Sequence, residues 1–544
     1  MESIKQKLVQ LGFAQVDGED HFLRVAVPSE HLYETARALR YEWDIPFDFL
    51  IDIVGMDFGD SLGVIYRLNS SQSPQSIIEL KTTTPDRDNP LLYSVHDLWQ
   101  SAGLYEREVY DFFGIGFINN PDMRRLFLRS DWYGYPLRKD YNADPAYNPI
   151  PYDNEEIDDM ERIRKIEIHD GKPVTTISQR FKTTDYVLNF GPQHPSTHGV
   201  LHLRVALDGE IIKDIDPNFG YIHRGIEKMS ESYTYPQILH LTDRLDYLSG
   251  TINRHGLCLC CEKALELDVP ERAHYIRTII DELTRIASHL LGWGCMCMDM
   301  GAITAFTYGM RDREKIMDIF EETSGGRLMV NYSVIGGVKD DIHPNFQRRV
   351  KAFIPYMRAM LKEHHLLFTG NPIARGRMKN VGCLTKEQAI SLGATGPVGR
   401  ASGWSNDVRK IAPYAAYSHA KFDEVIRQGG SAFDRYMARL DEIEESLKII
   451  EQLVDAIPEG AYAAKTKAVI RLPEGEFTQR VENARGEYDV YINSKGDKSP
   501  YRIKFRSPSL PLVNCLPFTV IEEKIADLMM VGGSLDYVIP CIDR

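Results

Sequence analysis

The fold of this chain is decided chiefly by one stretch, "VPERAHYIRTIIDELTRIASHLL" (Val269–Leu291). Its apolar residues recur at intervals of three and four, which is the spacing of one face of an α-helix. These residues are Ile276, Ile279, Ile280, Leu283, Ile286 and Leu290. A second pattern of the same kind runs from Leu440 to Ile457. Helices of this length pack as bundles around a shared core, so we predict a largely helical region here.

Strands are expected before these helices. The stretch "VLHLRVALDGEIIKDI" alternates apolar and polar residues from Leu201 to Leu207, and Asp208-Gly209 is a favoured hairpin turn. The segment "DYVLNF" precedes it. We therefore predict a domain over residues 183–544 that is mainly helical and carries small β elements at its periphery.

Residues 1–145 read as a separate, smaller domain. Three apolar runs typical of strands, "FDFLIDIVGM", "GVIYRLN" and "SIIELKT", are separated by segments rich in Asp, Gly, Ser and Pro. A helix is predicted over Val95–Phe113, with Ser94 as its N-cap and Asp97 completing a capping box. This order of elements predicts a small α+β domain with an antiparallel sheet. Residues 146–182, which contain prolines and the acidic run "NEEIDDME", read as a linker with room for one short helix.

The composition limits the classes of protein. The chain has 544 residues, 43% of them apolar, which is enough for at least two packed domains. Its 64 basic and 78 acidic residues give a net charge of −14, which favours solubility and gives no support to nucleic-acid binding. No segment reads as a signal peptide, and no apolar run is long enough to span a bilayer. Membrane association would then come through partner subunits.

The cysteines and glycines match no common cofactor motif. Eight cysteines are present, and no C-x-x-C pair has a matching second pair. Without a signal peptide, this sparse set indicates a reducing cytosol. No G-x-G-x-x-G or P-loop occurs, and "GATGPVGR" (Gly393–Arg400) reads as a turn between helices. We therefore expect no nucleotide, flavin or metal to be bound by this chain alone.

The loop "GPQHPSTHG" (Gly191–Gly199) carries His194 and His198 among prolines and glycines that stiffen it. A metal site, a proton-handling site and a plain rigid turn all fit this pattern. Two further segments, "GYIHRGIEK" (Gly220–Lys228) and "DRLDYLSG" (Asp243–Gly250), add arginines and aspartates whose burial is costly unless they are paired. They fit either a functional site or an ion-paired structural corner.

These motifs occur together in one known family. The sequence resembles a fused C/D subunit of bacterial respiratory complex I, the NADH:quinone oxidoreductase, over nearly the whole chain. The first domain is similar to the C (30 kDa-type) subunit through "EREVYDFFGIGFINNPDMRRLF" (Glu106–Phe127) and "YPLRKDY" (Tyr135–Tyr141). The second is similar to the D (49 kDa-type) subunit through the loop, the two segments and the helical stretch above, and through "GATGPVGR", "PYRIKFRSPS" and the terminal "CIDR".

The resemblance implies that the second domain has the fold of the nickel–iron hydrogenase large subunit. Those hydrogenases hold nickel with four cysteines, in R-x-C-G-x-C and D-P-C-x-x-C motifs. The corresponding positions here carry Asp246, Ser249, Val538 and Cys541. Because nickel–iron ligation needs soft thiolates, we do not expect a hydrogenase centre. In complex I the vacated metal cavity is similar to a quinone headgroup site.

The resemblance also implies roles for individual residues. His198 and Tyr247 match the pair that binds the quinone carbonyl oxygens, and Asp299 matches the acid that holds this histidine. His194 matches the other histidine of the loop. An imidazole with a pKa of about 6.5 and a phenol with a pKa of about 10 can both donate hydrogen bonds and protons to a quinone. A carboxylate behind the imidazole would fix its tautomer and stabilise its charged form.

The implied partners are the other subunits of the complex. Arg224 and Arg244 match arginines near the terminal iron–sulfur cluster, which the family carries in the neighbouring B subunit. The chain would then be a peripheral subunit on the cytoplasmic face of the bacterial cell membrane, in contact with the B, I and membrane-arm subunits. It would couple quinone reduction to proton pumping, as an enzyme active only in the assembled complex. A hydrogenase-like large subunit, a ferredoxin-dependent variant and a purely structural assembly subunit remain as alternatives.

Some positions depart from the family pattern. Asn120 precedes Pro121 where the family usually has histidine. Met329 stands where the family often places a histidine near the cluster, and Val334 and Ile335 replace the usual Arg-Pro. Loss of positive charge beside a cluster should lower its potential or remove its pH dependence. We therefore predict a quinone of low potential, such as menaquinone, or an electron donor other than NADH.

A group of basic residues in the first domain is expected to form a docking surface for neighbouring subunits. The group consists of Arg124, Arg125, Arg129, Arg138 and Lys139, with Trp132, Tyr133 and Tyr135 among them. A solvated basic face is the alternative.

Overall fold

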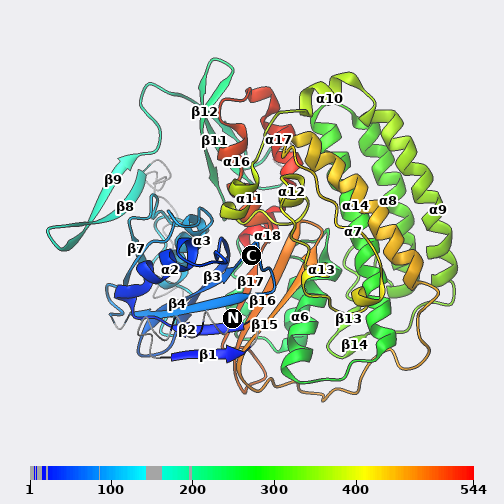
Figure 1. The fold of residues 1–544 in the computed structure, drawn as a ribbon, viewed down its shortest axis with the longest axis horizontal. Helices are drawn as coiled ribbons and strands as arrows, with labels where there is room; N and C mark the ends of the chain where they lie inside the picture. The colour runs from blue at the N-terminus through cyan, green and yellow to red at the C-terminus, as the bar shows by residue number, and fades with distance from the viewer. Residues whose placement is uncertain are drawn as a thin grey trace.

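The computed structural model of the chain describes residues 5, 8, 15–19, 22–84, 86–142, 162–194 and 199–544. In Figure 1 a smaller unit (blue to cyan) lies beside a larger helical unit (green to yellow). Between them run the orange strands β15 (Glu474–Asn483), β16 (Gly486–Lys495) and β17 (Arg502–Arg506). Across the described part of the chain, no helix has the length and apolar character needed to cross a membrane.

The first unit is built on a five-stranded sheet with the strand order β1-β2-β5-β4-β3. Its strands are β1 (Gln15–Glu19), β2 (Phe22–Ala26), β3 (Phe49–Asp57), β4 (Leu62–Asn69) and β5 (Ile77–Thr84). Neighbouring strands are antiparallel, except that β2 and β5 run parallel. Every residue of β3 and β4 is buried, which indicates that both faces of the sheet are covered there. The predicted α+β class is confirmed.

Two helices pack in this unit, α2 (Leu32–Tyr41) and α3 (Ala102–Phe113). The prediction that the second helix begins at Val95 with Ser94 as its N-cap is wrong. The Ser94 hydroxyl instead donates a hydrogen bond of 2.6 Å to the buried carboxylate of Glu106. Because this carboxylate also accepts the Val95 N–H at 2.9 Å, the residues before α3 are held in turns.

The segment expected to be a linker contains a hairpin. Strands β8 (Arg162–His169) and β9 (Lys172–Gln179) pair antiparallel, and β8 extends a small sheet with β6 (Leu91–Tyr93) and β7 (Gly116–Ile118). Figure 1 shows this hairpin projecting away from both units, and every residue of β9 is exposed. Residues 143–161 lie outside the described part of the chain, so the domain boundaries at 145 and 183 stay a prediction.

The strands expected around the histidine loop are present. Strands β10 (Tyr186–Phe190), β11 (His202–Asp208) and β12 (Ile211–Asn218) form an antiparallel sheet. Gly209 has a φ of +60°, a conformation that glycine adopts without strain, in the predicted hairpin turn. The "GPQHPSTHG" loop connects β10 to β11, as predicted.

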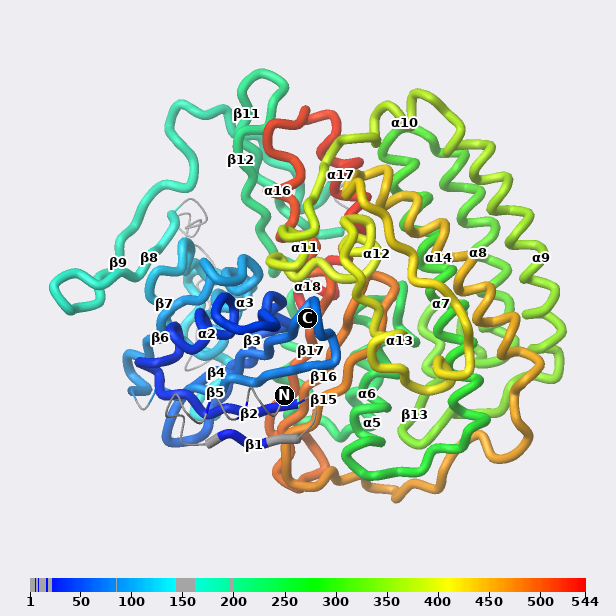
Figure 2. The backbone as a smooth tube through the Cα atoms, viewed as in Figure 1, coloured from blue at the N-terminus to red at the C-terminus, as the bar shows by residue number. Residues whose placement is uncertain are grey.

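The larger unit is a helical bundle around α7 (Glu271–Asp299), which contains most of the stretch Val269–Leu291. Around α7 pack the helices α6 (Gly250–Ala264), α8 (Ile303–Ser324), α14 (Ala432–Leu453) and α17 (Leu528–Leu535). Helix α9 (Phe346–His364) packs outside α8 and α14. The predicted helical core is confirmed, although α14 ends before Ile457. Figure 2 shows the same bundle as a tube at the right of the molecule.

Short elements complete the described structure. They are the helices α4 (Ile226–Ser230), α5 (Tyr235–Thr242), α10 (Pro372–Met378), α11 (Lys386–Leu392), α12 (Gly396–Ala401), α13 (Val408–Ile411), α15 (Ser509–Asn514), α16 (Leu516–Val520) and α18 (Ile539–Asp543), the π-helical turn η4 (His365–Thr369), the 3-10 turns η1 (Ser29–His31), η5 (Tyr417–His419) and η6 (Ile525–Asp527), and the strands β13 (Ser333–Val334) and β14 (Gly337–Val338).

Buried ion pairs join the two units. Lys504 and Arg544 of the larger unit both bind Glu108 of α3, the latter with a distance of 2.8 Å between nitrogen and oxygen. Arg124 of the smaller unit binds Asp216 on β12 at 2.8 Å. In Figure 2 the C-terminal end of the chain accordingly lies between the two units.

These contacts correct the expected docking surface. Arg124 is 7% exposed and holds the two units together. Arg125 binds Asp111 at 2.9 Å, and Arg138 donates to the Phe113 carbonyl at 2.6 Å. These three arginines therefore make contacts inside the chain, and only Arg124 is too buried for the expected surface; docking through the other basic residues stays a prediction.

Candidate functional site

Tyr247 lies in the turn between α5 and α6, where the segment "DRLDYLSG" places it. Its side chain is half-buried, while the preceding Asp246 is completely buried. Burial raises the pKa of the Tyr247 hydroxyl, and the nearby Arg485 guanidinium opposes that rise. The hydroxyl is therefore protonated at neutral pH and can donate a proton.

Arg485 occupies the centre of this region. It stands in the turn between β15 and β16 and is completely buried. Its guanidinium lies 2.9 Å from Asp246, 3.2 Å from Asp536, and within 3.4 Å of the hydroxyls of Ser249 and Ser288. Burial alone would lower the pKa of Arg485, but the two carboxylates raise it, so the side chain stays charged.

This arrangement bears on the positions matched to nickel ligands. Two of them, Asp246 and Ser249, bind the Arg485 guanidinium. The third, Val538, offers a backbone N–H to Ser509 Oγ at 3.1 Å. The Cys541 thiol accepts a hydrogen bond from Ser507 at 2.9 Å, and burial raises its pKa to about 11, so it is not a thiolate. In the part of the chain that the structure describes, no group of three or more His, Cys, Asp or Glu side chains is arranged to hold a metal ion.

Asp299 is the last residue of α7 and is half-buried. Cys295 lies one turn earlier on the same helix face and is among the groups that raise the pKa of Tyr247. Cys295 therefore lies near Tyr247, and Asp299 follows one turn further along α7. Tyr537, which the sequence did not single out, is a neighbour of Asp299. Burial raises the pKa of Tyr537, and the charge of Asp299 raises it further.

The remaining candidates are placed as follows. His198 lies outside the described residues. His194 is exposed and packs edge-on against Phe190, with 6.0 Å between ring centroids. Arg224 and Arg244 are both exposed, and Arg244 donates to the His240 carbonyl at 2.7 Å. Tyr247 and Asp299 are thus linked only through Cys295, which acts on Tyr247 and precedes Asp299 by one turn, whereas the two arginines are exposed.

The positions that depart from the family pattern have local roles. The Val334 carbonyl accepts from Arg277 at 2.6 Å, and Ile335 is buried in the core. The Asn120 amide donates to Glu106 at 2.7 Å. Burial raises the pKa of Glu106 to about 7, against the effect of its hydrogen bonds.

Two cavities lie near the site. The cavity that Tyr247 lines measures about 10 Å³, which is room for a single water molecule. A larger one of about 300 Å³ begins at Met300, next to Asp299, and is walled by mostly apolar residues of the α7–α8 turn, η4 and α10. The described residues of this chain therefore do not enclose a volume at Tyr247 large enough for an aromatic ring.

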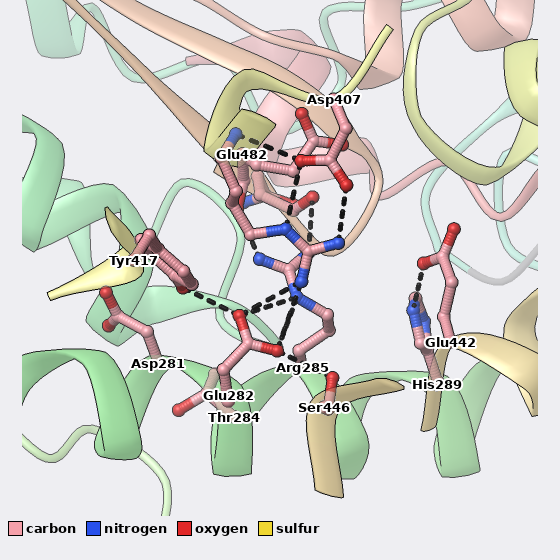
Figure 3. Close-up of polar contacts among 12 residues, drawn as sticks. Asp281, Glu282, Thr284, Arg285, His289, Asp407, Tyr417, Glu442, Ser446 and Glu482 are labelled. Atoms are coloured by element: carbon pink, nitrogen blue, oxygen red, sulfur yellow. Dashed lines mark hydrogen bonds and ion pairs between the residues drawn. The ribbon is translucent and has the colours of Figure 1, made fainter. Parts of the chain in front are cut away.

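A buried network of charges lies behind the site, along α7. In Figure 3, Glu282 is surrounded by dashed contacts, among them those to the Tyr417 and Ser446 hydroxyls, each 2.6 Å long. Arg285 and Arg409 also bind it, at 3.2 and 3.1 Å. Burial would raise the pKa of Glu282, but these arginines hold it at about 2.

The same network reaches towards Arg485. His289 of α7 binds Glu442 of α14 at 2.9 Å, and Arg400 bridges Glu442 to Glu482 of β15. The sequence does not reveal these pairs, because their members come from elements far apart in the chain: α7, α12, α14 and β15. The sequence gives one indication of the network: Glu282, Arg285 and His289 are ionisable residues beside the apolar face predicted for Val269–Leu291.

Comparisons with known proteins define the class. A family model described as "Respiratory-chain NADH dehydrogenase, 30 Kd subunit" matches residues 25–147. A second, described as "Respiratory-chain NADH dehydrogenase, 49 Kd subunit", matches residues 299–471 and 465–544. A solved chain of the membrane-bound sulfane sulfur reductase, an archaeal respiratory membrane complex, superposes with a TM-score of 0.65 and 31% identity, covering 67% of this chain and all of that one.

Curated relatives make the assignment more specific. The chain is 55% identical to the C/D subunit of NADH-quinone oxidoreductase from Phocaeicola vulgatus, over 96% of this chain and 99% of that protein. It is 54% identical to the C/D subunit from Bacteroides thetaiotaomicron, over 93% and 97% of the two chains. The separate D subunit from Bacillus mycoides matches 66% of this chain and 99% of its own length at 46% identity. The chain belongs to the family of fused C/D subunits of NADH-quinone oxidoreductase, so the resemblance noted in its motifs is confirmed.

Proposed function

We propose that Tyr247 and Asp299, together with His198, bind the headgroup of a quinone in the assembled complex. One observation carries this proposal: Cys295, which stands one turn before Asp299 on α7, is a neighbour of Tyr247, in a chain of a quinone oxidoreductase family. The cavity at Tyr247 is too small for a headgroup, so the remaining walls come from the histidine loop and from the neighbouring B subunit.

The residue types suit the reaction. Reduction of a quinone to a quinol takes up two electrons and two protons. The two electrons would come from the iron–sulfur cluster that the family carries in the neighbouring B subunit. The Tyr247 hydroxyl, kept protonated by burial, and the His198 imidazole donate hydrogen bonds to the two carbonyl oxygens and then protons. Asp299 orients the imidazole and stabilises its charged form.

The further roles follow from this site. Asp299 responds to the change of charge on His198, and this response starts the change that drives proton pumping in membrane-arm subunits. The exposed Arg224 and Arg244 face the cluster, and His194 forms the outer side of the loop.

The chain is a peripheral subunit on the cytoplasmic face of the cell membrane, bound to the B, I and membrane-arm subunits. The relatives' names and the membrane complex of the structural neighbour support this placement.

The quinone is proposed to be one of low potential, such as menaquinone. Met329 is half-buried and uncharged, and Val334 and Ile335 bring no cation where the family pattern has Arg-Pro. We expect the terminal cluster of the complex to have a lowered potential or to titrate without pH dependence. A redox titration at several pH values tests this, and a cluster with the usual potential and the usual pH dependence contradicts it.

The site is tested by steady-state quinone reduction in the assembled complex with His198→Ala and Tyr247→Phe. Both substitutions should remove most of the activity, while electron transfer to a soluble acceptor that bypasses the quinone site is kept. Tyr186→Phe is the matched control, because Tyr186 is 68% exposed. Near-normal quinone reduction by both variants would sink the proposal.

The alternatives have their own tests. A hydrogenase-like centre requires nickel, which metal analysis of the purified complex detects; the guanidinium bound by Asp246 and Ser249 argues against it. A purely structural subunit would not be labelled by a photoreactive quinone. An NADH- and flavin-binding subunit in the native complex would identify NADH as the electron donor. The absence of such a subunit would indicate ferredoxin or another reductant.

A further inference from the structure

We propose that Arg485 is a positioning residue for Tyr247: its guanidinium fixes the turn that presents the tyrosine to the quinone. This inference rests on the proposed role of Tyr247. Arg485 comes from the β15–β16 hairpin, more than 200 positions along the chain from the turn that it binds. Tyr247 lies outside both α5 and α6, so this tertiary contact adds to the local backbone hydrogen bonds that shape the turn.

The contacts lie on both sides of Tyr247. Asp246, the residue before it, binds Arg485 through its side chain at 2.9 Å and also accepts the Leu248 N–H at 3.2 Å. Ser249, at the start of α6, lies 3.4 Å from the same guanidinium nitrogen. A planar guanidinium presents its donors in a rigid fork, so it fixes the direction of both anchors more firmly than an ammonium group on a flexible stem does.

The other side of Arg485 is fixed in the helical core. Asp536, which ends α17, lies 3.2 Å from the second guanidinium nitrogen and 3.4 Å from Arg439 of α14. The Asp536 carboxylate also packs on α7: a Cβ at Gly292 would lie 3.0 Å from it. Asp246, Arg439, Arg485 and Asp536 thus form a buried set, here named the Arg485 cluster, with two positive and two negative charges.

The cluster also acts on Tyr247 through charge. Arg485 lowers the pKa of the Tyr247 hydroxyl, whereas Asp246, Cys295 and Asp536 raise it. Two further cations, Arg313 of α8 and Arg327, line the small cavity at Tyr247. A change at Arg485 therefore alters both where the hydroxyl points and how firmly it holds its proton.

Three variants in the assembled complex separate these effects. Arg485→Lys keeps the charge but loses the forked geometry; the KM for quinone should rise about tenfold with the pH profile unchanged. Arg485→Met also removes the cation, so the alkaline limb of the pH profile should move up by about one unit. In Arg485→Met with Asp246→Asn the cluster is neutral again, so the limb should move back while the KM stays high.

The controls and outcomes are as follows. Arg471→Met, at an exposed pair with Asp497, should leave all parameters unchanged. If Arg485→Lys has the wild-type KM and kcat while Tyr247→Phe is inactive, the positioning role of Arg485 is overturned and the proposed function is kept. Normal activity of Tyr247→Phe would overturn the proposed function. If neither Arg485→Lys nor the double variant assembles, Arg485 has a folding role and the positioning role is overturned.

Discussion

Arg67 on β4 and Asp489 on β16 form a completely buried, two-pronged ion pair between the two units, with nitrogen–oxygen distances of 2.9 and 2.7 Å. Asp52 and Glu79 lie beside the same guanidinium, at 3.4 and 3.5 Å. One cation from the smaller unit is thus shared by three buried carboxylates, one of which belongs to the larger unit. The two units of the fused chain are therefore joined by charge as well as by apolar packing.

Removing this cation should destabilise the whole chain. Arg67→Met leaves three buried carboxylates without their common partner, and breaking a buried pair in this way costs about 3–5 kcal/mol. Thermal unfolding of the full chain should show the loss. Arg37→Met, which breaks an exposed pair with Glu42, should change the free energy of unfolding by about 1 kcal/mol or less. Equal effects of the two substitutions would contradict this account.

Asn120→Ala should show a cost that depends on pH. The pKa of Glu106 is about 7 in the folded chain, above its ordinary value of about 4.3, so the fold loses stability as pH rises from about 4.3 to about 7. The Asn120 amide offsets part of that cost by donating to the carboxylate. The loss of unfolding free energy on substitution should therefore be larger at pH 8, about 1–3 kcal/mol, than at pH 5.

Asn345→Ala is the matched control for this experiment. Its amide donates to Glu322 at 3.0 Å, a carboxylate near the surface. This hydrogen bond lowers the pKa of Glu322, so Glu322 stays ionised from pH 5 to pH 8. The effect of the control substitution should be the same at both pH values. A pH-independent effect at Asn120 would show that Glu106 is already ionised at pH 5.

The helical core could be predicted from sequence because its signal is local. The three-and-four spacing within α7 and α14 is set by each helix's own apolar face, and Asp208-Gly209 is a turn signal that needs no distant partner. The start of α3 could not be predicted, since Ser94 pairs with Glu106 twelve positions away instead of capping a helix. The parallel pairing of β2 with β5 could not be predicted for the same reason, because it depends on two strands about 50 residues apart.

The site was predictable only in part. Tyr247 and Asp299 came from motif resemblance, and the structure adds that Cys295, one turn before Asp299, is a neighbour of Tyr247. Arg485 gave no signal, because its partners Asp246 and Asp536 are 239 and 51 positions away in the chain. Basic residues such as Arg124 were read as a surface, although their carboxylate partners are buried with them.

The charged network behind the site should be needed for folding. Glu282→Gln leaves Arg285 and Arg409 buried with one carboxylate fewer, so we expect a loss of about 3–5 kcal/mol in unfolding free energy. Because the folded pKa of Glu282 is about 2, the wild-type stabilisation should persist above pH 4.3 and disappear as pH falls towards 2. Acid unfolding monitored by circular dichroism measures this. Glu321→Gln, at an exposed carboxylate, should behave like wild type.

Asp299→Asn should separate stability from function. Asp299 ends α7, where the helix dipole makes a negative charge unfavourable by about 0.3–1 kcal/mol. Its removal should therefore leave the unfolding temperature of the chain unchanged or slightly higher. Quinone reduction by the assembled complex should nevertheless fall by tenfold or more, because the acid behind His198 is lost.

The matched control for this last experiment is Asp318→Asn, at a carboxylate that is 44% exposed on α8 and pairs with Arg327. It should change neither quinone reduction nor the unfolding temperature appreciably.

Asp299→Asn should also lower the pKa of Tyr537 towards its ordinary value, since the carboxylate charge is one cause of its rise. Ultraviolet titration of tyrosine in the chain, compared with Tyr537→Phe, detects that change. If Asp299→Asn lowers both the activity and the unfolding temperature, the carboxylate has a structural role. A carboxylate that serves catalysis at the C-terminus of a helix should instead lower stability, so that its removal does not destabilise the chain.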